Sequence, residues 1–353
     1  MRLEARAHTP AWLWLAAPAA ALSFTLLVTS LLVAWAGAPV ASAYALLLEG
    51  GFGSRFAWSE TMTRATPLIL TGLAAAVAFR ARLYNIGAEG QLYAGALAAV
   101  AVGGLHGGTG FGAPTGLLFI AMIGAACLAG AMLLLVSALL KSRFGVDEVV
   151  TTLLLNFIVL LLVSAMLDGP MKDPAALGWP QSVAIADALQ LQPLVPRSRM
   201  HSGLLLALLL AALLALLLRH TTLGFEIRAV GANARAAAFA GMPVHTVLWQ
   251  VALMSGALAG LAGAVEVAGR AGYVTLDMSP GYGYGGIVIA MLAGLHPLGV
   301  LAAGVFVAGV QVGADSMSRA LAVPTYIADV IVAASLLAVL VATLLTQYRV
   351  RMR

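Results

Sequence analysis

Long uninterrupted stretches of apolar residues restrict what this sequence can fold into. A helix needs about 20 mostly apolar residues to cross the hydrocarbon core of a membrane. The apolar runs cover residues 11–36, 64–79, 87–104, 114–140, 148–167, 203–219, 246–268, 284–293, 296–314 and 325–347. They predict an all-α fold, a polytopic membrane helical bundle of about ten transmembrane or half-membrane helices.

The overall composition supports a chain that resides in lipid. Hydrophobic residues make up 62% of the 353 residues and charged residues 9%, whereas soluble domains are about half apolar and a quarter charged. The first run, 11–36, is too long for the apolar core of a signal peptide, so we expect it to remain as a membrane helix. The run 284–293 is too short to cross alone, and the sequence leaves open whether it is a half-helix paired with 296–314 or crosses the membrane.

The positions of the basic residues predict the orientation. The net charge is +5, but lysines and arginines are scattered rather than clustered, which argues against a nucleic-acid partner. With the N-terminus in the cytoplasm, more of them fall inside than outside, so we expect both termini to be cytoplasmic. Residues 168–202 then form an extracytoplasmic loop and residues 219–245 a cytoplasmic segment of one transmembrane domain covering 1–353.

An unusual group of polar residues occurs in YNIGAEGQ, residues 84–91. A carboxylate at the bilayer centre costs roughly 3 kcal/mol on insertion scales, and such groups commonly mark solute paths. We therefore interpret the stretch as a polar constriction in a path, or else as a cytoplasmic turn in which Glu89 pairs with Arg80 or Arg82. Its polar side chains are Asn85, Glu89 and Gln91.

A second polar group follows in VDEVVTTLLLNF, residues 146–157. Glu148, Thr152 and Asn156 are spaced four apart, so they share one face of a helix. Asp147 and Glu148 stand where the helix N-terminus favours negative charge. The stripe either holds neighbouring helices together or contacts a solute, and the sequence favours neither.

Nothing in the sequence predicts catalysis or metal binding. The single Cys127 lies in an apolar run, and no grouping of His, Asp, Glu or Cys has metal-ligand spacing. The G-x-x-x-x-G-K-[ST] pattern of a phosphate-binding loop does not occur. If transport through this chain is driven by ATP, another chain must hydrolyse it.

Four stretches in order carry a specific resemblance: FRARLYNIGAEGQLYAGALAA, DEVVTTLLLNFIV, LGFEIRAVGANARAAAFAGM and GYGYGGIVIAMLAGLHPLG. They resemble the permease subunits of bacterial ABC importers for nucleosides and simple sugars, in the group that includes ribose and branched-chain amino acid permeases. The second stretch is similar to the longer of the two permease types. The fourth departs from the family pattern, with Gly285 and Gly286 where relatives often carry a polar residue.

The resemblance implies a function and a set of partners. The chain would be a multi-pass permease of the bacterial cytoplasmic (inner) membrane, opening a path for a nucleoside or simple sugar by alternating access. It would pair with a second, related permease, a cytoplasmic ATP-binding-cassette ATPase and an extracytoplasmic substrate-binding lipoprotein. It would bind no cofactor of its own, because the ATPase uses the ATP and Mg.

The resemblance also implies roles for particular residues. The segment from Gly231 to Gly241 becomes a helix that couples to the ATPase, rather than a plain surface connector. The candidate solute-path residues are Asn85, Glu89, Gln91, Thr152 and Asn156. The candidate coupling residues are Gly224, Arg228, Gly231, Asn233, Ala237, Ala238 and Gly241.

One rival belongs to a different class of transporter. An ion-coupled secondary transporter of a small polar solute could relay protons through Glu89 or Glu266 and would need no ATPase. Glu266 also has a structural interpretation, because Arg270 follows four residues later and can pair with it on a helix.

Overall fold

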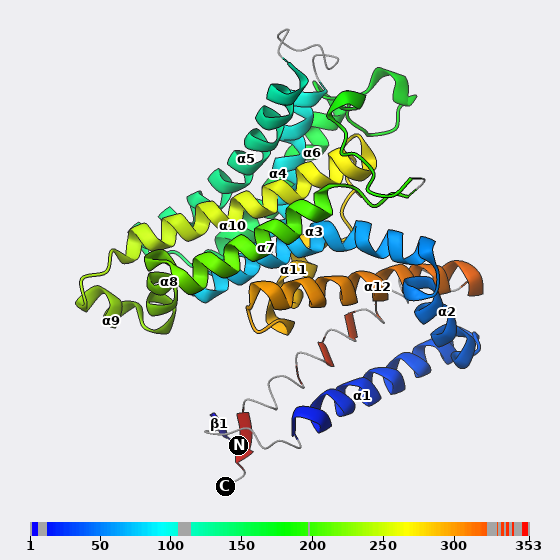
Figure 1. The fold of residues 1–353 in the computed structure, drawn as a ribbon, viewed down its shortest axis with the longest axis horizontal. Helices are drawn as coiled ribbons and strands as arrows, with labels where there is room; N and C mark the ends of the chain where they lie inside the picture. The colour runs from blue at the N-terminus through cyan, green and yellow to red at the C-terminus, as the bar shows by residue number, and fades with distance from the viewer. Residues whose placement is uncertain are drawn as a thin grey trace. The chain divides into compact units, whose positions relative to one another are not determined.

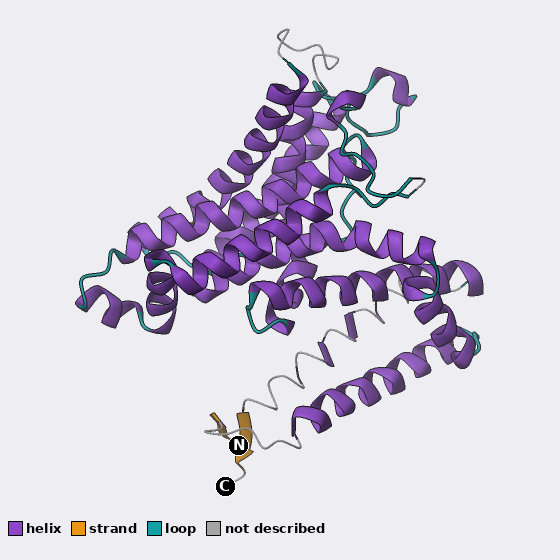
Figure 2. Ribbon diagram, in the orientation of Figure 1, coloured by secondary structure: helices purple, strands orange, loops and turns teal. Residues whose placement is uncertain are grey.

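The computed structural model describes residues 2–5, 13–104, 114–196, 198–322, 330, 333–334, 337–338, 341 and 348–351. Nearly all of the described chain is helical, which confirms the all-α expectation (Figure 2). The exception is a short antiparallel ladder between β1 (Arg2–Ala5) and β2 (Tyr348–Arg351). This pairing brings the two described ends of the chain side by side.

The helices follow the apolar runs closely. In order they are α1 (Leu13–Trp35), α2 (Val40–Phe52), α3 (Arg55–Arg80), α4 (Ala88–Gly103), α5 (Thr115–Phe144), α6 (Glu148–Asp168), α7 (Gly203–His220), α8 (Thr222–Ala232), α9 (Ala234–Phe239), α10 (Val244–Glu266), α11 (Tyr282–Leu292) and α12 (Pro297–Leu321). Short turns η2 (Pro174–Ala176) and η3 (Asp187–Leu189) lie between α6 and α7, and the π-helical turn η4 (Val267–Ala271) continues α10.

Six of the described helices are long and apolar enough to cross a membrane, or seven if one bent pair is counted as a span. The bend of 114° separates residues 26–35 from α2, a helix that the apolar runs did not predict. Helix α4 has 16 residues and α11 has 11, so both are shorter than a full crossing requires. Helix α11 has the length of a half-helix, one of the two alternatives for 284–293, and the run 325–347 lies largely outside the described residues.

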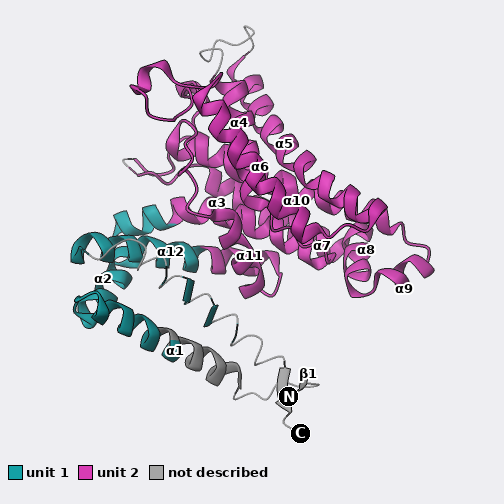
Figure 3. Ribbon diagram, turned by 180° about the vertical axis from the view of Figure 1, so that it is seen from behind, with its two compact units in different colours: residues 1–61, 305–353 teal, residues 62–304 magenta. Residues whose placement is uncertain are grey.

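The chain divides into two compact units, one of residues 1–61 with 305–353 and one of residues 62–304 (Figure 3). Every candidate site residue belongs to the second unit. In that unit α4, α5 and α10 lie side by side (Figure 1). A Cβ at Gly95 of α4 would come within 2.1 Å of the Gly260 carbonyl oxygen on α10. The helices therefore meet at backbone contact, as small residues allow in membrane helices.

The two polar connections of this unit lie at opposite ends of α7 (Figure 1). Residues 169–202 precede α7 and pair with the chain after η4, where Ser182 N donates to the Val274 carbonyl (2.9 Å) and Ile185 N to that of Gly272 (2.8 Å). Helices α8 and α9 follow α7 at its other end. The predicted extracytoplasmic loop and cytoplasmic segment are thus on opposite sides of the unit.

Candidate functional site

The polar stretch YNIGAEGQ forms a non-helical break between α3 and α4. The backbone leaves α3 after Arg80, and Arg82 adopts a left-handed conformation with φ of 54°. Irregular backbone inside a membrane protein must find hydrogen-bond partners within the protein. Side chains of α6 and Lys141 of α5 supply those partners, whereas α10 and α11 contact the side chains of the stretch.

The stripe on α6 satisfies the backbone of this break. Tyr84 N donates to Glu148 Oε1 (3.3 Å), and Ile86 N donates to Thr152 Oγ1 (3.4 Å). Asn156 Nδ2 donates to the Ile86 carbonyl oxygen (3.1 Å). Because these three α6 residues are one helical turn apart, each meets a successive part of the break. The shared face inferred from their spacing is confirmed.

The two amides of the break bind one another. Asn85 Nδ2 donates to Gln91 Oε1 and Gln91 Nε2 donates to Asn85 Oδ1, both at 2.8 Å. Asn85 Nδ2 also reaches Ser255 Oγ on α10 (3.0 Å), which itself donates to the Ala74 carbonyl of α3 (2.7 Å). The pair therefore connects α3, α4 and α10 through hydrogen bonds.

Glu89 lies where the N-termini of α4 and α11 meet. Its Oε2 accepts a hydrogen bond from Gly283 N (2.6 Å), and the positive ends of two helix dipoles favour a carboxylate there. A Cβ at Gly283 would come within 2.2 Å of the Glu89 nitrogen, so only glycine permits this approach. The alternative pairing of Glu89 with Arg80 or Arg82 is not what the structure shows.

The departure from the family pattern at Gly285 and Gly286 has a packing explanation. A Cβ at Gly286 would lie 2.5 Å from Thr71 Oγ1 on α3, and that hydroxyl donates to the Tyr282 carbonyl (2.8 Å). A larger residue at position 286 would force α11 away from α3.

All five candidate path residues are brought together and are at most 4% exposed. Each contacts protein groups, as when Asn156 Oδ1 accepts from Gly90 N (2.7 Å). At one edge of the group Lys141 forms an ion pair with Glu148 and donates to the Arg82 carbonyl (2.9 Å). These five side chains connect neighbouring helices through hydrogen bonds, and we call them the polar lock. Their contact with a solute stays a prediction.

Sequence reasoning missed the partners of this lock. Ser255 and Gly283 complete it from α10 and α11, but they are 170 and 194 residues away along the chain from Asn85 and Glu89, respectively. A lone serine in a Gly- and Ala-rich helix was the available signal for Ser255. The Gly-rich fourth motif was the signal for Gly283.

The predicted coupling segment consists of two helices rather than one. Gly231 does not precede the alanine-rich helix but lies within α8, where a Cβ would come within 1.8 Å of the Arg80 carbonyl oxygen. Asn233 begins α9, because its Oδ1 accepts from Arg235 N and Ala236 N (both 3.1 Å). Gly241, with φ of 84°, follows the end of α9.

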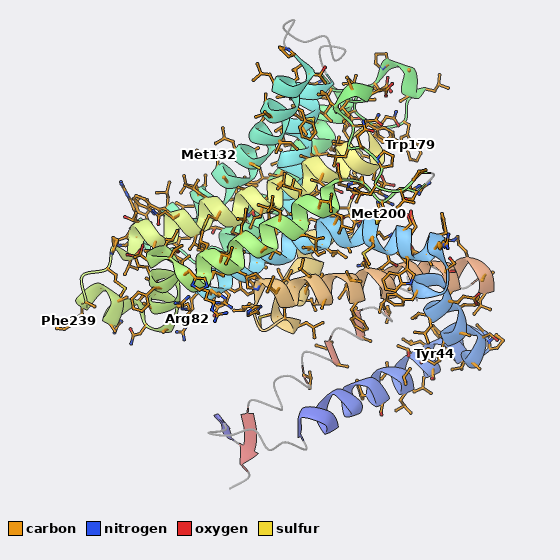
Figure 4. All side chains as sticks on the ribbon, viewed as in Figure 1. Tyr44, Arg82, Met132, Trp179, Met200 and Phe239 are labelled. Atoms are coloured by element: carbon orange, nitrogen blue, oxygen red, sulfur yellow. The ribbon has the colours of Figure 1, made fainter. Side chains whose placement is uncertain are left out.

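The remaining coupling residues differ in what they contact. Gly224 packs on α7, where a Cβ would come within 2.3 Å of the Leu217 carbonyl oxygen, and Arg228 donates to the Leu218 carbonyl. Ala237 is 4% exposed, whereas Ala238 is exposed. Phe239 is 96% exposed and projects from the tip of α9 (Figure 4), so this helix presents a large unpartnered apolar side chain.

The Glu266–Arg270 pair predicted from its spacing is confirmed. Arg270 Nη1 donates to Glu266 Oε1 (2.7 Å) and lies 3.4 Å from the Tyr282 hydroxyl. The pair occupies the junction of α10 and the π-helical turn η4. No group of three metal-binding side chains occurs among the described residues.

Comparison with known proteins gives matches along most of the chain. The family model described as branched-chain amino acid transport system / permease component matches residues 57–340. A guanosine ABC transporter permease of Bacillus subtilis is 37% identical over 90% of this chain and 90% of its own length. A glucose ABC transporter permease of Haloferax volcanii is 36% identical over 99% and 93%. A nucleoside ABC transporter permease of Lactococcus lactis is 31% identical over 82% and 81%.

Proposed function

Because the chain belongs to the permease component family of branched-chain amino acid transport systems, we propose that it forms the path for a nucleoside in an ABC importer. The observation that carries the proposal is the similarity to the guanosine permease, which extends over nine-tenths of both chains. A simple sugar is the second candidate, on the similarity to the glucose permease. The comparisons give the ion-coupled alternative no support.

In the proposed importer, this chain and its partner subunits have different roles. This chain is the transport component and a multi-pass protein of the cytoplasmic membrane. A cytoplasmic ATPase that uses ATP and Mg supplies the energy, a second permease completes the path, and an extracytoplasmic binding lipoprotein delivers the solute. Arg80, Lys141 and Arg143 end their helices on the α8–α9 side, which supports a cytoplasmic position for that side.

In this proposal α9 docks on the ATPase. Its exposed face offers Ala238 and Phe239 to a partner, whereas its buried Ala237 packs on the chain itself. The five polar residues shape the solute path by fixing the break between α3 and α4 against α6, α10 and α11. Movement of α8 and α9 would reach this break directly, because Gly231 contacts the Arg80 carbonyl.

Purification of the tagged chain from its host in mild detergent tests the assembly. We expect an ATPase with a phosphate-binding loop and a second permease to accompany the wild-type chain. Ala238→Asp places a charge on the exposed face of α9 and should remove the ATPase while the chain still inserts. A chain that reproducibly purifies without any ATPase would contradict the proposal.

Two further variants separate docking from folding. Phe239→Ala removes only an exposed side chain and should also weaken ATPase binding, by about tenfold or more if it is a central anchor. Ala237→Asp buries a charge and should lower the amount of folded chain. Full ATPase retention by both Ala238→Asp and Phe239→Ala would reject α9 as the docking helix.

Uptake measurements test the solute. Cells lacking only this permease should lose uptake of radiolabelled guanosine at low external concentration, and the wild-type gene should restore it. Glucose uptake is the matched measurement in the same cells. Loss of glucose uptake with intact guanosine uptake would replace the nucleoside by a sugar and would leave the importer itself unchallenged.

A further inference from the structure

A cationic cavity lies beside α8, and its lining includes none of the five polar residues of the lock. Its volume is about 460 Å³, and it is an open cavity lined by the ends of α3 and α7, by α8 and by the start of α12. Its charged or titratable lining consists of Arg80, Arg219, His220, Arg228 and His296. All of these belong to the unit of residues 62–304.

The three guanidinium groups of the cavity have no acidic partner. Arg80 Nε donates to the Leu295 carbonyl (2.9 Å) and Arg228 donates to the Leu218 carbonyl. Within the described residues no carboxylate lies within 4.0 Å of Arg80, Arg219 or Arg228. Two of the three cations around the cavity are held by neutral carbonyls, so their positive charge is uncompensated and favours an anion.

Backbone N–H groups at the start of α12 also favour an anion in the cavity. Helix α12 begins at Pro297, directly on the cavity wall, and Leu298 in its first turn also lines the cavity. The first N–H groups of a helix lack intrahelical partners, and its N-terminus carries a partial positive charge. The N-terminus of α12 and the guanidinium groups therefore both make the cavity electropositive.

The apolar walls of the cavity continue onto an exposed face of α7. Leu205, Leu209, Ala212 and Leu216 lie on the side of α7 that carries Arg219, as their spacing of three to four residues requires. Leu205 is 54% exposed, Leu209 54% and Leu216 56%. From Leu205 to Arg219 the helix rises about 21 Å, which exceeds the roughly 15 Å thickness of one hydrocarbon leaflet.

From this arrangement we infer that the cavity binds an anionic phospholipid, with its phosphate among the three arginines and an acyl chain along the leucine face of α7. A free phosphate would use the arginines but not the leucines, whereas the lipid uses both. Basic pockets between membrane helices at the cytoplasmic surface are suited to anionic head groups. The inference requires only that the chain spans a membrane, and it is independent of the transported solute.

Native mass spectrometry of the delipidated full-length chain tests the inference. Phosphatidylglycerol and phosphatidylcholine with the same acyl chains are added at equal concentrations. We expect preferential retention of phosphatidylglycerol by the wild-type chain. Arg219→Gln should weaken that retention about fivefold, since one arginine near an anionic lipid contributes roughly that factor, and Arg219→Lys should keep most of it.

The controls distinguish the lipid from other anions and from a protein. Arg143→Gln removes an exposed cation from the last turn of α5, outside the cavity, and should leave retention unchanged. Equal retention of both lipids, or equal effects of Arg219→Gln and Arg143→Gln, would overturn the inference. Displacement of the lipid by inorganic phosphate in excess would identify a free-anion site instead. Loss of a co-purified ATPase from Arg219→Gln, with lipid retention intact, would assign the cavity to a protein interface.

Discussion

Individual polar residues in this chain stabilise an irregular backbone that a membrane protein must otherwise avoid. Asn85 is fully buried and serves three groups, namely the Gln91 amide, the Ser255 hydroxyl and the Gly87 N–H. Asn85→Leu leaves these groups buried without their partner, at about 1–3 kcal/mol each. We expect a clear loss of thermal stability in detergent, measured by the melting temperature.

The matched control for Asn85 lies on α6. Thr151 donates only to the Glu148 carbonyl of its own helix and is not fully buried. Thr151→Val should therefore change the melting temperature little. If Asn85→Leu proved as stable as Thr151→Val, the polar lock would not contribute to the fold.

His201 predicts how stability depends on pH. It is 2% exposed, neither ring nitrogen has a hydrogen-bond partner, and burial lowers the pKa of its imidazole to about 4. Because burial disfavours the charged imidazolium, the folded state is most stable when His201 is neutral. The free energy of unfolding is therefore highest above the unfolded pKa near 6.5, and it decreases as the pH falls from there towards about 4. When the pH falls from about 8 to about 5, we expect the free energy of unfolding to decrease by about 2 kcal/mol.

Thermal unfolding at both pH values checks this prediction. His201→Leu should remove part of the pH dependence, since its side chain cannot bind a proton. His245→Leu, at an exposed site, should keep the wild-type dependence. An unchanged pH dependence in His201→Leu would contradict the assignment to His201.

At the scale of helices, glycine allows α4 and α10 of the second unit to pack at backbone contact. A Cβ at Gly263 of α10 would come within 1.9 Å of the Leu92 carbonyl oxygen on α4, whereas nothing lies within 4 Å of a Cβ at Gly124 on α5. Gly263→Ala should cost roughly 1–3 kcal/mol because the helices must separate. Gly124→Ala should be neutral or slightly stabilising, because alanine favours helix. Melting temperatures of the two variants test the difference, and equal values would contradict it.

The sequence predicts such elements better than it predicts their contacts. Apolar runs predict most helices, because the backbone N–H and C=O groups of a segment that crosses lipid must be hydrogen-bonded within the protein. Helix α2 was missed because it has only 13 residues, too few for a membrane span, and follows a turn at Gly37 and Pro39. The separation of α8 from α9 depends on one cap, Asn233. The contacts of the lock with Ser255 and Gly283 span 170 and 194 residues, respectively, and no local pattern encodes them.

At the scale of the whole molecule, transport by alternating access requires helices of the bundle to move relative to one another. Ser255, a partner of the polar lock, is fully buried, so the conservative variant Ser255→Cys should react slowly with a membrane-impermeant thiol reagent in the resting complex. If the polar lock shapes the solute path, alternating access must separate α4 from α10 or α11, and ATP turnover with solute should accelerate labelling. The experiment is carried out in the Cys127→Ala variant, because Cys127 is the one native cysteine and would otherwise be labelled as well.

Leu177→Cys provides the positive control, since Leu177 is 99% exposed and its labelling should be fast with or without ATP. Slow labelling at position 255 both at rest and during turnover, in a complex that still transports, would mean that the lock moves as a rigid element. The solute would then pass along another surface of the bundle, and the five polar residues would retain only their structural role. Acceleration restricted to conditions with ATP and solute would instead place the break between α3 and α4 within the moving path.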